Sequence, residues 1–201
     1  VMVDSQVRVN DVTDRVLQAA LLAVPRERFC APDRAFAAYA ETEVEITGSR
    51  KLMAAREVSK LLMALDPRPG ERVLAIAAPY AAAVLAGMGL DVIAQEGDAD
   101  VFDVAGTALA EAGVKTVVAP LTTPHGEGYD LIVSEAATPV RPLAWIAALK
   151  PGGRLAVVER TGPAGRAVLY VQGRDGLSRR ELFDAAPSVL AELAPVPTFS
   201  L

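Results

Sequence analysis

The stretch VLAIAAPYAAAVLAGMGLDVIAQ, residues 73–95, decides the fold class of this chain. It begins with a short apolar run, Val73–Ile76, continues with small apolar residues over Ala81–Gly87, and returns to an apolar run at Asp91–Gln95. This pattern predicts a buried strand, a helix and a second buried strand. Strands joined by helices of about ten residues pair in parallel through right-handed crossovers. The stretch therefore predicts a doubly wound α/β fold.

The same alternation continues toward the C-terminus. Further strands are expected at Val114–Ala119, Tyr129–Val133 and Arg154–Val158, with helices at Val101–Ala112 and Pro142–Leu149. The run Gly173-Arg174-Asp175-Gly176 has the composition of a turn. It predicts that Ala167–Val171 forms an antiparallel pair with a last apolar segment near Pro197–Leu201. The expected sheet is thus mostly parallel.

Residues 1–66 have a different, helical character. Apolar residues at helical spacing predict one helix over Asn10–Ala23, capped by Asn10 and Asp11, and another from Ala54 to Leu65. Between them, Phe29–Ile46 is broken by proline and is interpreted as short helical turns and a loop. We therefore expect an N-terminal helical cap and substrate-loop region at 1–66, packed on an α/β domain at 67–201 as one compact unit.

Composition excludes several classes of protein. The chain of 201 residues has a net charge of −5, which disfavours nucleic acid as a partner. A single cysteine, Cys30, and a single histidine, His125, exclude an internal disulfide and a histidine-rich zinc site. The longest apolar stretch contains Pro79 and fits a strand and a helix better than a membrane span. The N-terminal residues lack a secretory pattern, which predicts a cytoplasmic protein; the sequence leaves open a monomer or a homodimer.

Ligands of open α/β sheets bind beyond the carboxyl ends of the strands, near the point where the strand order reverses. The segments expected there are Ala77–Tyr80, Gln95-Glu96, Ala119-Pro120 and Ser134–Ala137. Within the last of these, Glu135 has two interpretations, a ligand contact or the cap of a following turn. Trp145 is interpreted as a packing residue and His125 as an exposed loop residue.

Several motifs together resemble one family, the protein-L-isoaspartate O-methyltransferases. The motifs are Val24-Pro25-Arg26-Glu27-Arg28-Phe29, Arg68-Pro69-Gly70-Glu71-Arg72-Val73-Leu74 and Leu149-Lys150-Pro151-Gly152-Gly153-Arg154-Leu155. The resemblance spans most of the chain and implies a seven-stranded, Rossmann-like methyltransferase sheet. It also implies S-adenosylmethionine as cofactor and a protein or peptide carrying an L-isoaspartyl residue as substrate.

The resemblance assigns site residues one by one. Ala77, Ala78 and Tyr80 match the family's glycine-rich cofactor loop, although this chain has no glycine there and Pro79 lacks an N–H group. Glu96 lies 20 residues after Ile76, at the spacing of an acid that binds ribose hydroxyls. Pro120 matches an adenine-contacting position.

The substrate loop corresponds to Gly48, Ser49 and Arg50, and the family's hydroxyl position is Ala54 in this chain. Arg50 also belongs to a small basic cluster with Lys51 and Arg56, which is either a receptor for an acidic substrate or a solvated surface. No residue is assigned a catalytic role.

Two functions remain open at this point. The first is methyl transfer from S-adenosylmethionine to an isoaspartyl carboxylate, in which the protein mainly orients the reactants. The second is a catalytically inactive relative that keeps the fold as a binding or regulatory module and needs no cofactor.

Overall fold

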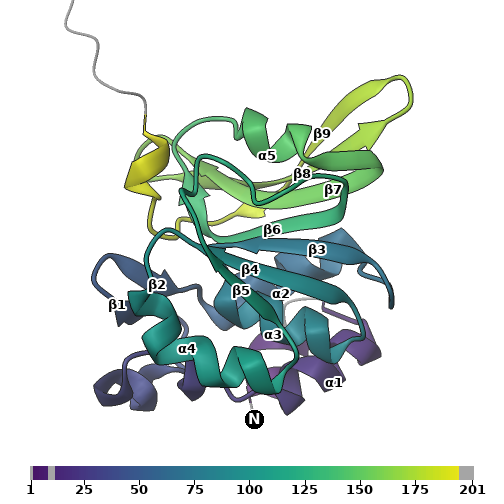
Figure 1. Cartoon of the computed structure of the whole chain (residues 1–201). Helices are drawn as coiled ribbons and strands as arrows, with labels where there is room; N and C mark the ends of the chain where they lie inside the picture. Colours follow the sequence, from purple (N-terminus) through teal and green to yellow (C-terminus); the bar gives the residue numbers. More distant parts are fainter. Residues whose placement is uncertain (1, 9–11, 195–201) are drawn as a thin grey trace, which may run out of the picture.

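A seven-stranded sheet forms the centre of the computed structural model, which describes residues 2–8 and 12–194 (Figure 1). The strands are β3 (Arg72–Ile76), β4 (Asp91–Glu96), β5 (Lys115–Val118), β6 (Tyr129–Thr138), β7 (Leu149–Arg160), β8 (Gly165–Gly173) and β9 (Gly176–Asp184). Their order is β5-β4-β3-β6-β7-β8-β9, parallel from β5 to β7 and antiparallel beyond. The doubly wound, mostly parallel fold is therefore confirmed.

Both faces of the sheet are covered. The helices are α1 (Arg15–Ala23), α2 (Ala55–Leu65), α3 (Pro79–Gly87), α4 (Asp100–Glu111) and α5 (Leu143–Ala147). Val73 and Ala75 of β3 belong to a buried cluster with side chains of α1 to α4, whereas Leu74 and Ile76 belong to a second cluster with Trp145 of α5. Successive strand residues point to opposite faces, so a strand between two apolar layers is continuously apolar. This explains why residues 73–76 form an uninterrupted apolar run in the sequence.

The N-terminal region contributes side chains to the first cluster. Its short elements are η1 (Val3–Val7), η3 (Arg26–Phe29) and η4 (Pro32–Ala37). Helix α1 begins at Arg15, because the Asp14 carboxylate accepts hydrogen bonds from the N–H groups of Val16 and Leu17. The predicted start of this helix at Asn10 is therefore wrong, and the expected Asn10/Asp11 cap lies outside the described residues.

A two-stranded hairpin follows, β1 (Val44–Thr47) and β2 (Arg50–Leu52). The sequence interpretation as a loop is wrong here. Val44 and Ile46 are buried while Glu45 between them is exposed, which is the two-residue period of a half-buried strand. Gly48 makes the turn with φ +54°, a conformation that glycine adopts without steric cost.

The antiparallel end of the sheet also differs from the expectation. The turn at Gly173–Gly176 is confirmed, but it joins β8 to β9. The expected partner at Pro197–Leu201 lies outside the described residues. Most side chains of β9 are exposed, so its charged sequence lacks the apolar pattern by which we searched for strands. None of the described helices has the length and apolarity needed to cross a membrane.

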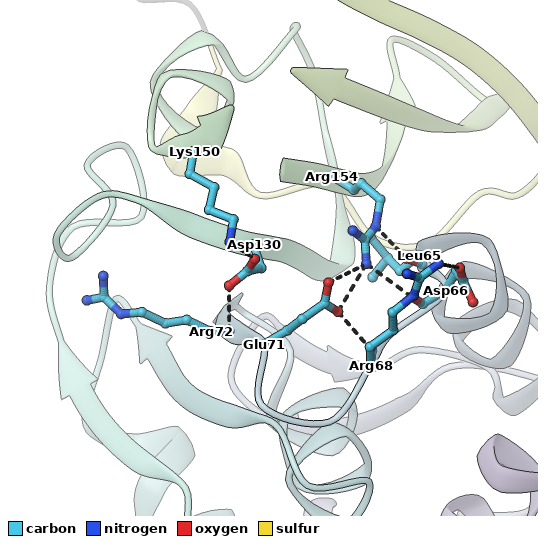
Figure 2. Close-up of polar contacts among 8 residues, drawn as sticks. All are labelled: Leu65, Asp66, Arg68, Glu71, Arg72, Asp130, Lys150 and Arg154. Atoms are coloured by element: carbon cyan, nitrogen blue, oxygen red, sulfur yellow. Dashed lines mark hydrogen bonds and ion pairs between the residues drawn. The ribbon is translucent and has the colours of Figure 1, made fainter. Parts of the chain in front are cut away.

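A polar network ties the amino ends of the strands together (Figure 2). Arg154 of β7 donates to the carbonyl oxygens of Leu65 and Asp66 at 2.7 and 3.1 Å and to both Glu71 carboxylate oxygens at 3.0 Å. Asp130 of β6 accepts from the Arg72 N–H at 2.9 Å and pairs with Lys150. This network, to which two of the quoted motifs contribute Glu71, Arg72, Lys150 and Arg154, therefore holds the α2–β3 turn against β6 and β7.

We expect Glu71→Ala to lower the free energy of unfolding by about 1–3 kcal/mol, because it removes the acceptor of a half-buried guanidinium. Arg68→Ala is the control, since the Arg68 side chain is 73% exposed and its pair with Asp66 is a surface contact. Urea unfolding of both variants measures the difference. Equal losses would contradict a structural role for the Arg154–Glu71 pair.

Candidate functional site

The candidate site lies where the strand order reverses, at the carboxyl ends of β3, β4 and β6. Two other segments reach this edge, the β1–β2 hairpin and the C-terminal turn η5 (Ala191–Leu193), both at the left of Figure 1. The chain before η5 is held there because Ala137 of β6 exchanges backbone hydrogen bonds with Ser188 and Leu190. A cavity of about 250 Å³ remains between these segments. It is lined by Thr47, Gly48, Ser49, Arg50, Gly97, Asp98, Asp100, Val101 and Glu192.

An ion pair between Arg50 and Glu96 closes the inner side of this region. The Arg50 Nε donates to Glu96 Oε2 at 3.0 Å and Nη2 donates to Oε1 at 3.2 Å. The Arg50 side chain is 11% exposed and that of Glu96 is 1% exposed. Burial raises the pKa of Glu96, and the Arg50 charge and hydrogen bonds oppose that rise. The structure thus joins a predicted substrate residue directly to a predicted cofactor residue.

The loop that should hold the cofactor's amino-acid end is buried. Ala77, Ala78 and Tyr80 are each at most 1% exposed. Ala77 has φ +52°, a left-handed conformation that is unfavourable for a residue with a Cβ, and its N–H donates to the Gln95 carbonyl at 2.9 Å. The Tyr80 ring packs edge-on against Phe29, with 5.6 Å between ring centroids. Tyr80 therefore faces the N-terminal elements.

Glu135 of β6 caps helix α3. Its Oε1 accepts from the Ala81 N–H at 2.6 Å, and its Oε2 has no hydrogen-bond partner. Burial raises the pKa of Glu135 to about 7, while the Ala81 hydrogen bond and the charges of Arg26 and Arg50 oppose the rise. The predicted cap of the turn that follows β6 is therefore wrong, because the carboxylate accepts from the first turn of α3 instead. The ligand contact, the other interpretation of Glu135, stays a prediction.

Arg26 is a site residue that sequence reasoning missed. It is fully buried, and it donates to the carbonyl oxygens of Ala38 at 2.9 Å and Met53 at 2.7 Å. Its guanidinium carbon lies 4.6 Å from the centroid of the Tyr80 ring. Arg26 thereby fixes the chain after β2 beside the cofactor loop. The available signal was its place inside the Val-Pro-Arg motif, which we interpreted only as a family marker.

Pro120 lies at the end of β5 and is exposed. Its carbonyl accepts from the side-chain amide of Gln95, which also donates to Thr123 and accepts from the His125 N–H. Gln95 is fully buried, so this amide holds the whole loop after β5 in place. His125 is exposed, as expected. Trp145 donates from its indole N–H to the Leu121 carbonyl at 2.8 Å and packs on the opposite face, which confirms its packing role.

We expect Ala77→Gly to cost about 1 kcal/mol less stability than Ala78→Gly. Each substitution removes one buried methyl group and gives the unfolded chain the same added freedom, but only Ala77 has a positive φ, which costs roughly 1–2 kcal/mol with a Cβ. Urea denaturation of the pair isolates the strain. Equal losses would show that the left-handed residue stores none.

Glu135→Gln should change the pH dependence of stability. The pKa of Glu135 is near 7 in the folded chain against an ordinary value of 4.5, so its stabilising contribution is complete below pH 4.5 and is lost as pH rises through 7. The amide does not titrate. We expect the variant to gain stability relative to the wild type between pH 5 and 8, as measured by urea unfolding. If the difference in free energy of unfolding between the variant and the wild type did not change with pH, Glu135 would not titrate in this range.

Three comparisons with known proteins agree. The family model described as protein-L-isoaspartate(D-aspartate) O-methyltransferase (PCMT) matches residues 2–177. The protein-L-isoaspartate O-methyltransferase of Methylorubrum extorquens is 34% identical to this chain over 192 residues, which cover 92% of this chain and 83% of the relative. The enzyme of the same name from Methylorubrum populi is 33% identical over 192 residues, which cover 92% of this chain and 90% of the relative.

A Plasmodium falciparum crystal structure, described as such an enzyme in complex with S-adenosyl-L-homocysteine, has the same fold. Its TM-score is 0.80 at 16% identity, over 95% of this chain and 97% of that one. The motifs that we identified at both ends of the sheet, the strand order and the match over residues 2–177 lead to one conclusion: this chain belongs to the protein-L-isoaspartate O-methyltransferase family.

Proposed function

We propose that the chain transfers a methyl group from S-adenosylmethionine to the carboxylate of an L-isoaspartyl residue in a protein or peptide. The observation that carries the proposal is the family match, which covers the cap, the hairpin and the parallel sheet together. The alternative, an inactive relative acting as a binding module, receives no support from the comparisons. A cytoplasmic location, the lack of nucleic-acid and membrane partners, and the choice between monomer and homodimer stay predictions from the sequence.

The residues fit the cofactor at its nucleoside end. Glu96 lies at the end of β4, between Arg50 and Gly97 of the cavity lining, with both carboxylate oxygens bonded to Arg50. A carboxylate at this place is suited to accept hydrogen bonds from a ribose diol once Arg50 moves away. Pro120, exposed at the end of the adjacent strand, offers an apolar ring but no side-chain acceptor. We assign these two residues to the ribose and the adenine.

The amino-acid end fits less well. Pro79 has no N–H group, and the Ala81 N–H of the first turn of α3 already donates to Glu135. By their position in the family motif, we assign to this end the residues Ala77, Ala78 and Tyr80. Because their side chains are buried, the cofactor would contact the backbone of the loop and not these side chains. The chain therefore binds the amino-acid end with fewer free N–H groups than a glycine-rich loop offers.

The chemistry demands little of the protein beyond orientation. A substrate carboxylate is already a nucleophile, so no general base is needed, and alignment of the two reactants supplies the acceleration. S-adenosylmethionine, when bound, would supply the methyl group: the new bond to the carboxylate oxygen would form as the bond to the sulfur breaks, and S-adenosylhomocysteine would leave. We assign Gly48, Ser49 and Arg50 to the substrate, because they line the cavity beside Glu96.

Calorimetric titration with S-adenosylmethionine tests the proposal. We expect a Kd below about 100 μM, or roughly 5.5 kcal/mol. Glu96→Gln should weaken binding at least about tenfold, because it removes a charged acceptor. Asp98→Asn is the matched control, since Asp98 lines the same cavity but is exposed.

Methyl-ester formation on an isoaspartyl peptide, with the aspartyl peptide as control, then tests the substrate. The proposal would be overturned if millimolar cofactor gave no heat of binding and no shift of the unfolding temperature, because a ligand of the native state must stabilise that state.

A further inference from the structure

The Arg50–Glu96 pair is the least exposed ion pair within residues 2–8 and 12–194. It connects two segments that are 46 residues apart, the hairpin strand β2 and the last residue of β4. Both carboxylate oxygens of Glu96 are engaged, each by a different guanidinium nitrogen. A planar, two-point contact of this kind is the strongest that arginine makes with a carboxylate.

This pair competes with the function proposed for Glu96. Each Glu96 oxygen could accept a second hydrogen bond, but the Glu96 side chain is only 1% exposed while Arg50 covers it. A ribose diol therefore reaches the carboxylate only when the guanidinium moves away, so the cofactor and the guanidinium exclude each other. When the cofactor displaces it, Arg50 is a nearly buried cation that has lost its anion. Such a broken pair is strongly unfavourable unless another anion replaces the carboxylate. Cofactor binding to Glu96 therefore requires a new partner for Arg50.

The surroundings restrict what that partner can be. Asp98, Asp100 and Glu192 are the other charged residues of the cavity lining, and they repel an anion from the part of the cavity away from the guanidinium. An anion in this cavity is therefore held at Arg50. The group that most closely matches the displaced Glu96 side chain is another carboxylate, planar and able to accept two hydrogen bonds. Arg50 also follows directly on Gly48 and Ser49, the segment assigned to the substrate.

We infer that Arg50 orients the carboxylate that is to be methylated, and that substrate and cofactor bind by exchanging the Arg50–Glu96 pair for two new contacts. The substrate carboxylate takes the guanidinium, and the ribose takes Glu96. This inference rests on the proposed function. Because each ligand frees the residue that the other needs, the two bind with positive coupling, and linkage makes that coupling equal in both directions.

Arg50→Gln separates this role from a merely structural one. Without the guanidinium, Glu96 is free, so S-adenosylhomocysteine should bind the variant tighter than it binds the wild type. At the same time the KM for the isoaspartyl peptide should rise at least about tenfold. A residue that only supports the fold would weaken both. Lys51→Gln, a neighbouring exposed cation on the same strand, is the control and should change neither.

The coupling itself is measured by titrating S-adenosylhomocysteine with and without saturating peptide. The wild type should show a Kd lowered at least about fivefold by the peptide. Arg50→Gln should show no dependence on peptide. If Arg50→Gln unfolds, Arg50→Lys takes its place. Lysine keeps the positive charge but cannot make the two-point contact, so this variant should show weaker coupling and a raised KM.

The possible failures are distinguishable. If wild type binds and methylates but Arg50→Gln binds S-adenosylhomocysteine more weakly, or keeps the coupling, the exchange is refuted and the proposed function stands. If neither the wild type nor the variant binds the ligand at millimolar concentration, both the proposed function and the exchange are overturned.

Discussion

The burial of β3 between two apolar layers is the constraint on which the rest of this structure depends. Each of the residues Val73–Ile76 is fully buried, and they alternate between the helices α1 to α4 on one face and α5 on the other. A strand in this position must pair on both edges, with β4 and β6, because its backbone groups have no access to water. Those two parallel pairings create the reversal of strand order, and with it the place for a ligand.

The two ends of the sheet use charge differently. At the amino ends, hydrogen bonds of Arg154, Glu71 and Asp130 hold neighbouring strands together, so several residues of the family motifs have a structural role. Near the carboxyl ends, Glu96 and Glu135 are buried, and Arg50 of the hairpin, 11% exposed, contacts Glu96. Charges buried at such a position need partners that are equally buried, and here the partners come from the hairpin and from α3.

The cofactor loop shows how a change in sequence is absorbed by its neighbours. Ala77 keeps a left-handed backbone although it is not glycine, and Pro79 begins α3 at a position where a missing N–H is tolerated. The N–H of Ala81, in the first turn of the helix, is satisfied by Glu135; burial disfavours the charge of this carboxylate, and the nearby charges of Arg26 and Arg50 favour it. The loop, the hairpin and the N-terminal motif are thus one connected unit around the site.

The sequence alone determined the parallel sheet, the edge of the sheet at which a ligand is expected and the family, because apolar periodicity and local motifs are properties of neighbouring residues. It also placed Glu96 and Arg50 separately in the site. It did not determine the β1–β2 hairpin, the α1 cap or the β9 edge strand, whose patterns are short or polar. Only the tertiary structure decided that Arg50 lies on Glu96, that Glu135 caps α3 and that Arg26 holds Met53 beside Tyr80. These contacts join residues far apart in the chain, and which buried charge meets which partner is set by how the layers pack.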